Sequence, residues 1–76
     1  MAQQVRTFKD MSVREMVDGV GRDVITWDMD GEILIGKLHY IRADKSNYNL
    51  AAGITVKIGK ELIHWNGDLW KNAIFA

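Results

Sequence analysis

The chain lacks cysteine, net charge and any long hydrophobic run, and each absence removes a class of protein. Without cysteine it forms no disulfide, and two histidines are too few for a structural zinc site. Neither of the two features that usually stabilise very small domains is therefore available. Ten Lys and Arg balance ten Asp and Glu, so the composition does not favour a strongly basic nucleic-acid binder, although a local basic patch is compatible with it. No run of about 18 apolar residues is present, which excludes a membrane-spanning helix.

The size and hydrophobicity of the chain favour self-association. A chain of 76 residues buries only roughly 60–65% of its extended surface, so a monomer would be marginally stable. Yet 47% of the residues are hydrophobic, including three tryptophans. We expect some of them to be buried against further copies, with a compact monomer as the alternative. The first residues lack the basic-then-apolar pattern of a secretory signal, so we expect a cytoplasmic protein.

The first 22 residues predict an arm followed by a short helix. Residues 1–10 show no periodicity. Ser12 and Glu15 have the spacing of a capping box, in which a hydroxyl and a carboxylate satisfy backbone donors reciprocally. Gly19 is expected to end the helix in a left-handed conformation.

The remainder of the chain predicts five short strands. They cover 24–29, 32–41, 48–52 continued by 54–58, 61–65 and 69–75. Asp30-Gly31 and Asn66-Gly67 are typical of two-residue hairpin turns, and Gly36 marks a bend inside the longest strand. The predicted fold is therefore mainly β: one domain, 1–76, in which a short N-terminal α-helix precedes a strongly bent, five-stranded SH3-like barrel over 23–76.

Two motifs resemble the Sm-like (LSm/Hfq) family over roughly residues 12–75. The first joins a bent, glycine-containing strand to a loop that ends in an aromatic residue and an asparagine; here it comprises Gly31, Gly36-Lys37-Leu38, Ile41, Asp44 and Tyr48-Asn49-Leu50. The second is the turn motif before the last strand, here Ile63 to Asp68. The chain departs from the family twice, because Asp44 lies one residue further from Asn49 and because Asn66 replaces the family arginine.

The resemblance implies a homo-oligomeric ring in which the fourth strand of one subunit pairs with the fifth strand of the next around a pore. The residues themselves favour the same contact. The strands at 61–65 and 69–75 would be apolar sheet edges with little charge beyond Glu61 and Lys71, and such edges invite pairing. A head-to-tail contact whose rotation closes produces a ring.

The resemblance also implies a single-stranded RNA site at the pore. Tyr48 would stack on a base and Asn49 would bond its edge; alternatively, Tyr48 packs in a core or interface and Asn49 caps its own turn. The turn at Asn66, Gly67 and Asp68 is expected to approach the loop that contains Asp44, although a hairpin alone also explains its residues. Arg42, Lys45 and Lys37 either contact phosphate or belong to a solvated surface.

No catalytic, metal or cofactor site emerges from the sequence. Asp28 to Gly31 is similar to part of a calcium loop, but Lys37 occupies the position of the required acid. His39 and His64 are isolated, and no nucleophile–base pair can be assembled. We therefore expect a non-enzymatic ring that binds single-stranded RNA. The alternatives are a ring-forming structural or adaptor protein, for example a phage-type assembly component, or an SH3-like protein-interaction module.

Overall fold

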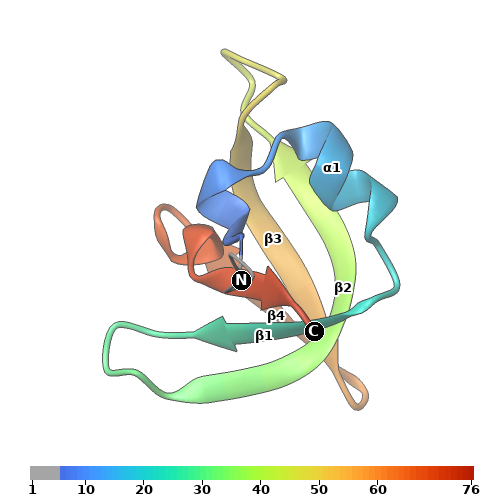
Figure 1. Ribbon diagram of the computed structural model, residues 1–76, viewed down its shortest axis with the longest axis vertical. Helices are drawn as coiled ribbons and strands as arrows, with labels where there is room; N and C mark the ends of the chain where they lie inside the picture. The colour runs from blue at the N-terminus through green and yellow to red at the C-terminus, as the bar shows by residue number, and fades with distance from the viewer. Residues whose placement is uncertain (1–5) are drawn as a thin grey trace, which may run out of the picture.

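The computed structural model describes residues 6–76, which form one bent antiparallel sheet with a short helical segment beside it (Figure 1). The elements in chain order are η1 (Phe8–Asp10), α1 (Val13–Asp18), β1 (Asp23–Trp27), β2 (Ile33–Ala43), β3 (Ala51–Ile58), β4 (Glu61–Asn66), η2 (Leu69–Lys71) and β5 (Ala73–Phe75). The strand order is β4–β3–β2–β1–β5. The prediction of a mainly β fold with one short helix and five strands is confirmed. The sheet is not closed, because β4 pairs only with β3 and β5 pairs only with β1 within the described residues.

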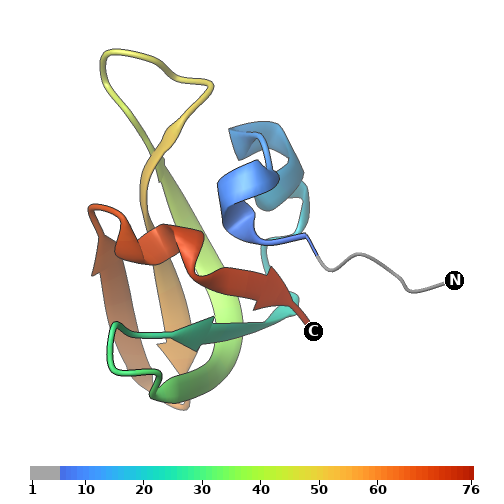
Figure 2. The same ribbon diagram turned by 60° about the vertical axis from the view of Figure 1, so that its left-hand side comes forward.

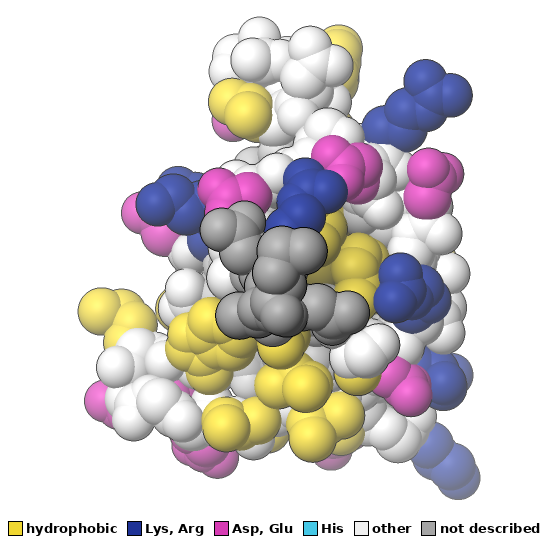
Figure 3. Space-filling view, viewed as in Figure 1, with side chains coloured by type: hydrophobic (Ala, Val, Ile, Leu, Met, Phe, Trp, Pro, Cys, Tyr) yellow, Lys and Arg dark blue, Asp and Glu magenta, His cyan; other side chains and the backbone are white. Residues whose placement is uncertain are grey.

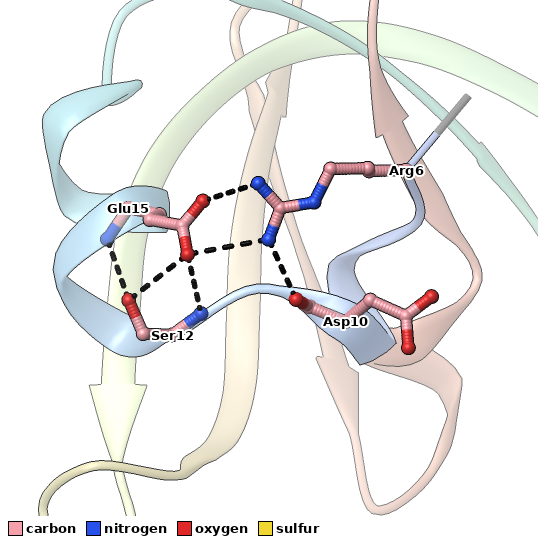
Figure 4. Close-up of polar contacts among 4 residues, drawn as sticks. All are labelled: Arg6, Asp10, Ser12 and Glu15. Carbon is pink, nitrogen blue, oxygen red and sulfur yellow. Dashed lines mark hydrogen bonds and ion pairs between the residues drawn. The ribbon is translucent and has the colours of Figure 1, made fainter. Parts of the chain in front are cut away.

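The predicted capping box at the start of α1 is present. The Ser12 hydroxyl accepts a hydrogen bond from the Glu15 backbone N–H (3.2 Å), and the Glu15 carboxylate accepts one from the Ser12 N–H (3.4 Å). Arg6 joins this cluster through an ion pair with Glu15 (2.7 Å) and a hydrogen bond to the Asp10 carbonyl (Figure 4). The Arg6 contact, followed by the Ser12 backbone N–H, lowers the pKa of Glu15. Residues 6–10 of the predicted arm are thereby tied to the first turn of α1, and residues 1–5 of that arm lie outside the described residues.

The end of α1 differs from the prediction. Gly19 has a φ of −96° and is therefore not left-handed; Gly21, in the linker to β1, has a φ of +96°. Gly19 is buried, and a Cβ at this position would overlap the ring of Phe75. The glycine is thus explained by close packing against β5 rather than by its backbone conformation.

Strand β2 changes partners near its glycine. It pairs with β1 through Ile33–Lys37 and with β3 through Lys37–Ala43, and it curves strongly between them (Figure 1). A Cβ on Gly36 would lie 2.5 Å from the Lys57 carbonyl oxygen. The absent side chain therefore permits the close approach of β3 at the predicted bend.

The turn predictions were wrong at three places. Asp30-Gly31 is not a two-residue turn, because the last β1–β2 pair is Trp27 with Ile33 and a five-residue loop connects them. Gly59 and Lys60, where no turn was predicted, form the two-residue turn of the β3–β4 hairpin, with φ +62° at the glycine. The Asn66-Gly67 turn does not join neighbouring strands, since β4 and β5 lie at opposite edges of the sheet. The predicted strand at 69–75 is the η2 turn followed by the three-residue β5.

The core lies between the concave side of the sheet and the N-terminal segment. Figure 2 shows η1 and α1 beside the sheet. The largest fully buried side chains are those of Phe8, Met16, Val24, Thr26, Leu38, Ile54 and Val56. Thr26 is accommodated because its hydroxyl donates to the Leu34 carbonyl (3.0 Å). Within residues 6–76, no helix has the length and apolar character needed to cross a membrane.

Candidate functional site

The β2–β3 connection is a projecting loop that is held by its own hydrogen bonds (Figures 1 and 2). The Asp44 carboxylate accepts hydrogen bonds from the Ser46 hydroxyl (2.6 Å) and the Ser46 N–H (2.8 Å), and these contacts lower its pKa. The Asp44 N–H donates to the Leu50 carbonyl (2.8 Å) and closes the loop. One oxygen of Asp44 therefore organises its own turn.

Tyr48 and Asn49 lie in this loop. Both were expected to begin the third strand, but that strand begins at Ala51, because the hydrogen-bonded turns of residues 44–50 take these positions. Tyr48 is 74% exposed, which removes a core role within this chain. The residue that caps the turn is Asn47, whose side-chain oxygen accepts from the Asn49 N–H (3.0 Å). The side chains of Tyr48 and Asn49 are thus exposed on a structured loop.

A cleft of about 530 Å³ lies between the start of β3 and the segment after β4. Its lining includes Asp44 and Leu50 from the β2–β3 loop and Gly67 and Asp68 from the turn after β4. These two segments, more than 15 residues apart in the sequence, do approach each other. The chain can therefore present groups from both loops to one ligand.

The lining of the cleft also includes charged and aromatic residues that were not predicted as site residues, namely Lys9, Trp70 and Lys71. Lys71 forms an ion pair with Asp68 (2.9 Å), and its ammonium group lies 5.9 Å from the centre of the Trp70 ring. Asp68 and Lys71 are three residues apart, which is a spacing typical of a helical turn. A strand was predicted at 69–75 instead because most of its residues are hydrophobic. Lys9 could not be predicted from its sequence neighbours, because it lines the cleft only once the chain has folded and η1 lies beside the sheet.

The other predicted residues lie outside this cleft. Lys45 is exposed in the β2–β3 loop. Gly53 of β3 lies opposite Arg42 of β2 on one side and Asn66 of β4 on the other. The Arg42 guanidinium occupies the space that a Cβ at Gly53 would need, and the Asn66 side-chain oxygen lies beside it. A guanidinium from β2 therefore lies close to the turn that follows β4.

The structure contains no obvious metal site among residues 6–76, where no three His, Asp or Glu side chains come together. His64 is engaged with the Thr55 hydroxyl (2.8 Å). The arrangement suits binding by stacking and hydrogen bonding. Comparisons of the chain with protein families, curated proteins and solved structures find no match.

Proposed function

We propose that the chain is an Sm-like protein with an SH3-type barrel that assembles into a homo-oligomeric ring and binds single-stranded RNA near the pore. The observation that carries the proposal is that the last two strands of the chain, β4 and β5, form the two edges of the sheet. Within residues 6–76 neither edge pairs with a further strand, so each presents backbone donors and acceptors that favour strand addition. Pairing of β4 with β5 of the next copy continues the sheet head to tail, and a closing rotation gives a ring.

Exposed apolar side chains support this contact. Residues that lie opposite each other on paired strands point to the same face of the sheet. Leu62 of β4 lies opposite Lys57, which lies opposite Lys37. Ile74 of β5 lies opposite Ile25, which lies opposite Ile35. Lys37 and Ile35 share one face of β2, so Leu62 and Ile74 also share that face. Leu62 is 47% exposed in the single chain. Pairing of the edges would bring it beside Ile74 and remove apolar surface from water.

The cleft and the β2–β3 loop support the RNA part of the proposal. Tyr48 offers an exposed ring for stacking, and Asn49 offers an amide that can bond a base edge. Lys9 lines the cleft and forms no ion pair within residues 6–76. Asp44 and Asp68 would repel phosphate, so base contacts are expected to contribute more than backbone charge.

Light scattering tests the ring, and we expect a mass of several chains. Leu62→Lys should lower that mass, because a charge would be buried at the seam. Leu50→Lys is the matched control, since Leu50 is similarly exposed (55%) but lies in the β2–β3 loop. A monomeric wild-type chain would contradict the ring and, with it, the pore.

Fluorescence titration with short oligo-U and oligo-A at two salt concentrations tests RNA binding. The double variant Tyr48→Ala and Asn49→Ala should weaken binding by roughly tenfold or more, as expected for the loss of a stacked base. Tyr40→Ala is the control, because Tyr40 is an exposed tyrosine (57%) on the sheet. Unchanged binding by the double variant would remove these residues from the site.

A ring-forming structural or adaptor protein is the second candidate. It is favoured by the zero net charge and by Asn66 at the position of the family arginine. It predicts the same oligomer mass but no oligonucleotide binding even at low salt.

A further inference from the structure

A basic groove lies at the other end of the sheet from the cleft. Its volume is about 470 Å³, and its lining consists of Asp23, Ile35, Gly36, Lys37, Lys57, Ile58 and Gly59. Lys37 and Lys57 are directly opposite each other in the β2–β3 ladder. Like charges in this position destabilise a sheet, so the pair has a cost that an anionic partner would relieve.

The charges of the groove are only partly compensated within the chain. Lys37 forms an ion pair with Asp23 (3.0 Å), whereas Lys57 forms none within residues 6–76. Ile35 and Ile58 give the groove an apolar wall, and Ile35 is 62% exposed. The groove therefore suits an apolar side chain that is accompanied by carboxylates.

The β1–β2 loop, residues 28–32, has this chemistry. Met29 is 89% exposed, the highest value among the exposed large hydrophobic residues. The neighbouring Asp30 and Glu32 are exposed and form no ion pair within the described chain. Figure 1 places this loop at the lower left, and at that edge Figure 3 shows a protruding hydrophobic side chain with acidic side chains below it. Lys and Arg side chains lie along the right edge of the same view.

The loop is held in one conformation before any partner binds. The Asp28 side chain accepts hydrogen bonds from the backbone N–H groups of Asp30 and Glu32, both at 2.9 Å. The Asp28 carbonyl also accepts from the Gly31 N–H (3.0 Å). A preorganised loop loses little conformational entropy on docking.

The loop lies away from the lysines of the groove in its own chain. The groove is at the Asp23–Lys37 pair, and the loop follows the Trp27–Ile33 pair at the opposite end of the same hairpin. Four strand steps separate these pairs, or about 13 Å. A contact between the loop carboxylates and Lys37 or Lys57 therefore joins two copies.

We propose that the loop Asp28–Glu32 of one copy docks into the basic groove of a second copy. Met29 packs against Ile35, on the face of the sheet that carries Lys37 and Lys57, and the carboxylates of Asp30 and Glu32 approach these two lysines. The contact is heterologous, because the two surfaces differ. It differs from the proposed β4–β5 seam, which it adjoins where Lys57 lies opposite Leu62 in the β3–β4 ladder.

Disulfide trapping tests this contact directly, because the chain contains no cysteine. The Met29→Cys protein is mixed with the Ile35→Cys protein under mild oxidation, and mixed dimers are counted by mass spectrometry. Cross-linking should be on the order of tenfold faster than with Leu50→Cys as the second protein, because docking raises the local thiol concentration. Leu50, 55% exposed, is the matched control. Equal rates for the two pairs would overturn the proposal.

Charge reversal provides the second test. Adding Asp30→Lys and Glu32→Lys to the Met29→Cys protein should abolish the rate advantage, and so should adding Lys37→Glu and Lys57→Glu to the Ile35→Cys protein. Mixing the two reversed proteins should restore the advantage. Circular dichroism confirms that each variant is folded. If the reversed proteins lose the rate advantage but their mixture does not restore it, the proposal is overturned. It is also overturned if Lys37→Glu with Lys57→Glu weakens oligonucleotide binding but leaves the cross-linking rate unchanged.

Discussion

Replacing Gly36 with alanine distinguishes two reasons for a glycine inside a strand. If the position needed no special packing, alanine would stabilise the strand by roughly 0.5–1 kcal/mol. The structure predicts the opposite, since a Cβ would lie 2.5 Å from the Lys57 carbonyl oxygen and 2.7 Å from the Cγ1 atoms of Val56 and Ile58. Overpacking of this kind costs about 1–3 kcal/mol. The net loss should therefore reach up to about 2.5 kcal/mol, with about 1 kcal/mol at the middle of the two ranges, and each kcal/mol should lower the Tm by about 4–8 °C for a domain of this size.

Thermal and urea unfolding followed by circular dichroism measure this loss. Lys37→Ala is the control, because Lys37 is the next residue, points to the opposite face and is exposed; its effect should stay within about 0.5 kcal/mol. A Gly36→Ala protein that melts at or above the wild-type temperature would refute the close approach of β3 as the reason for the glycine.

Three further outcomes follow from the described contacts. Ser12→Ala removes the cap of α1 and should lower the free energy of unfolding by about 1 kcal/mol, seen as a lower urea midpoint. The hydrogen bonds from Ser46 lower the pKa of Asp44. They therefore stabilise the folded chain at pH values above the ordinary carboxyl pKa of about 3.9, and this stabilisation is lost as the pH falls through the lowered pKa. Ser46→Ala should therefore be destabilised at pH 7 but match wild type near pH 2, in urea unfolding at both values. Tyr48→Ala, at a 74% exposed position, should change stability by less than about 0.5 kcal/mol in the same assay.

Features that depend on neighbouring residues could be predicted from the sequence. The capping box was correct because its hydrogen bonds join Ser12 and Glu15 within one turn. The bend in β2 was correct because a glycine interrupts an otherwise apolar strand, and β2 indeed exchanges β1 for β3 there. The approach of Asp44 to Asp68 was also anticipated, through the family resemblance rather than through any local pattern.

Features decided by side-chain turn chemistry or by distant packing could not be predicted. Asp30-Gly31 has the composition of a two-residue turn, but the Asp28 side chain binds two backbone N–H groups and stabilises a wider loop. The Asn66-Gly67 pair suggests a hairpin, yet β5 finds its partner in β1, and no local pattern encodes that choice. Gly19 was assigned to a helix stop because its real constraint, the ring of Phe75, lies at the far end of the chain.

The two proposed contacts between copies differ in their physical basis, and salt should separate them. The β4–β5 seam consists of backbone hydrogen bonds and apolar contacts such as Leu62 with Ile74, which salt screens little. The loop-to-groove contact depends on carboxylates meeting Lys37 and Lys57 at the surface, where the Debye length falls from about 10 Å at 0.1 M salt to about 3 Å at 1 M. Because one contact uses the sheet edges and the other uses the ends of the β1–β2 hairpin, both can form in the same assembly. An increase in salt should therefore reduce higher assemblies to the ring, whereas the Leu62→Lys substitution should break the ring itself.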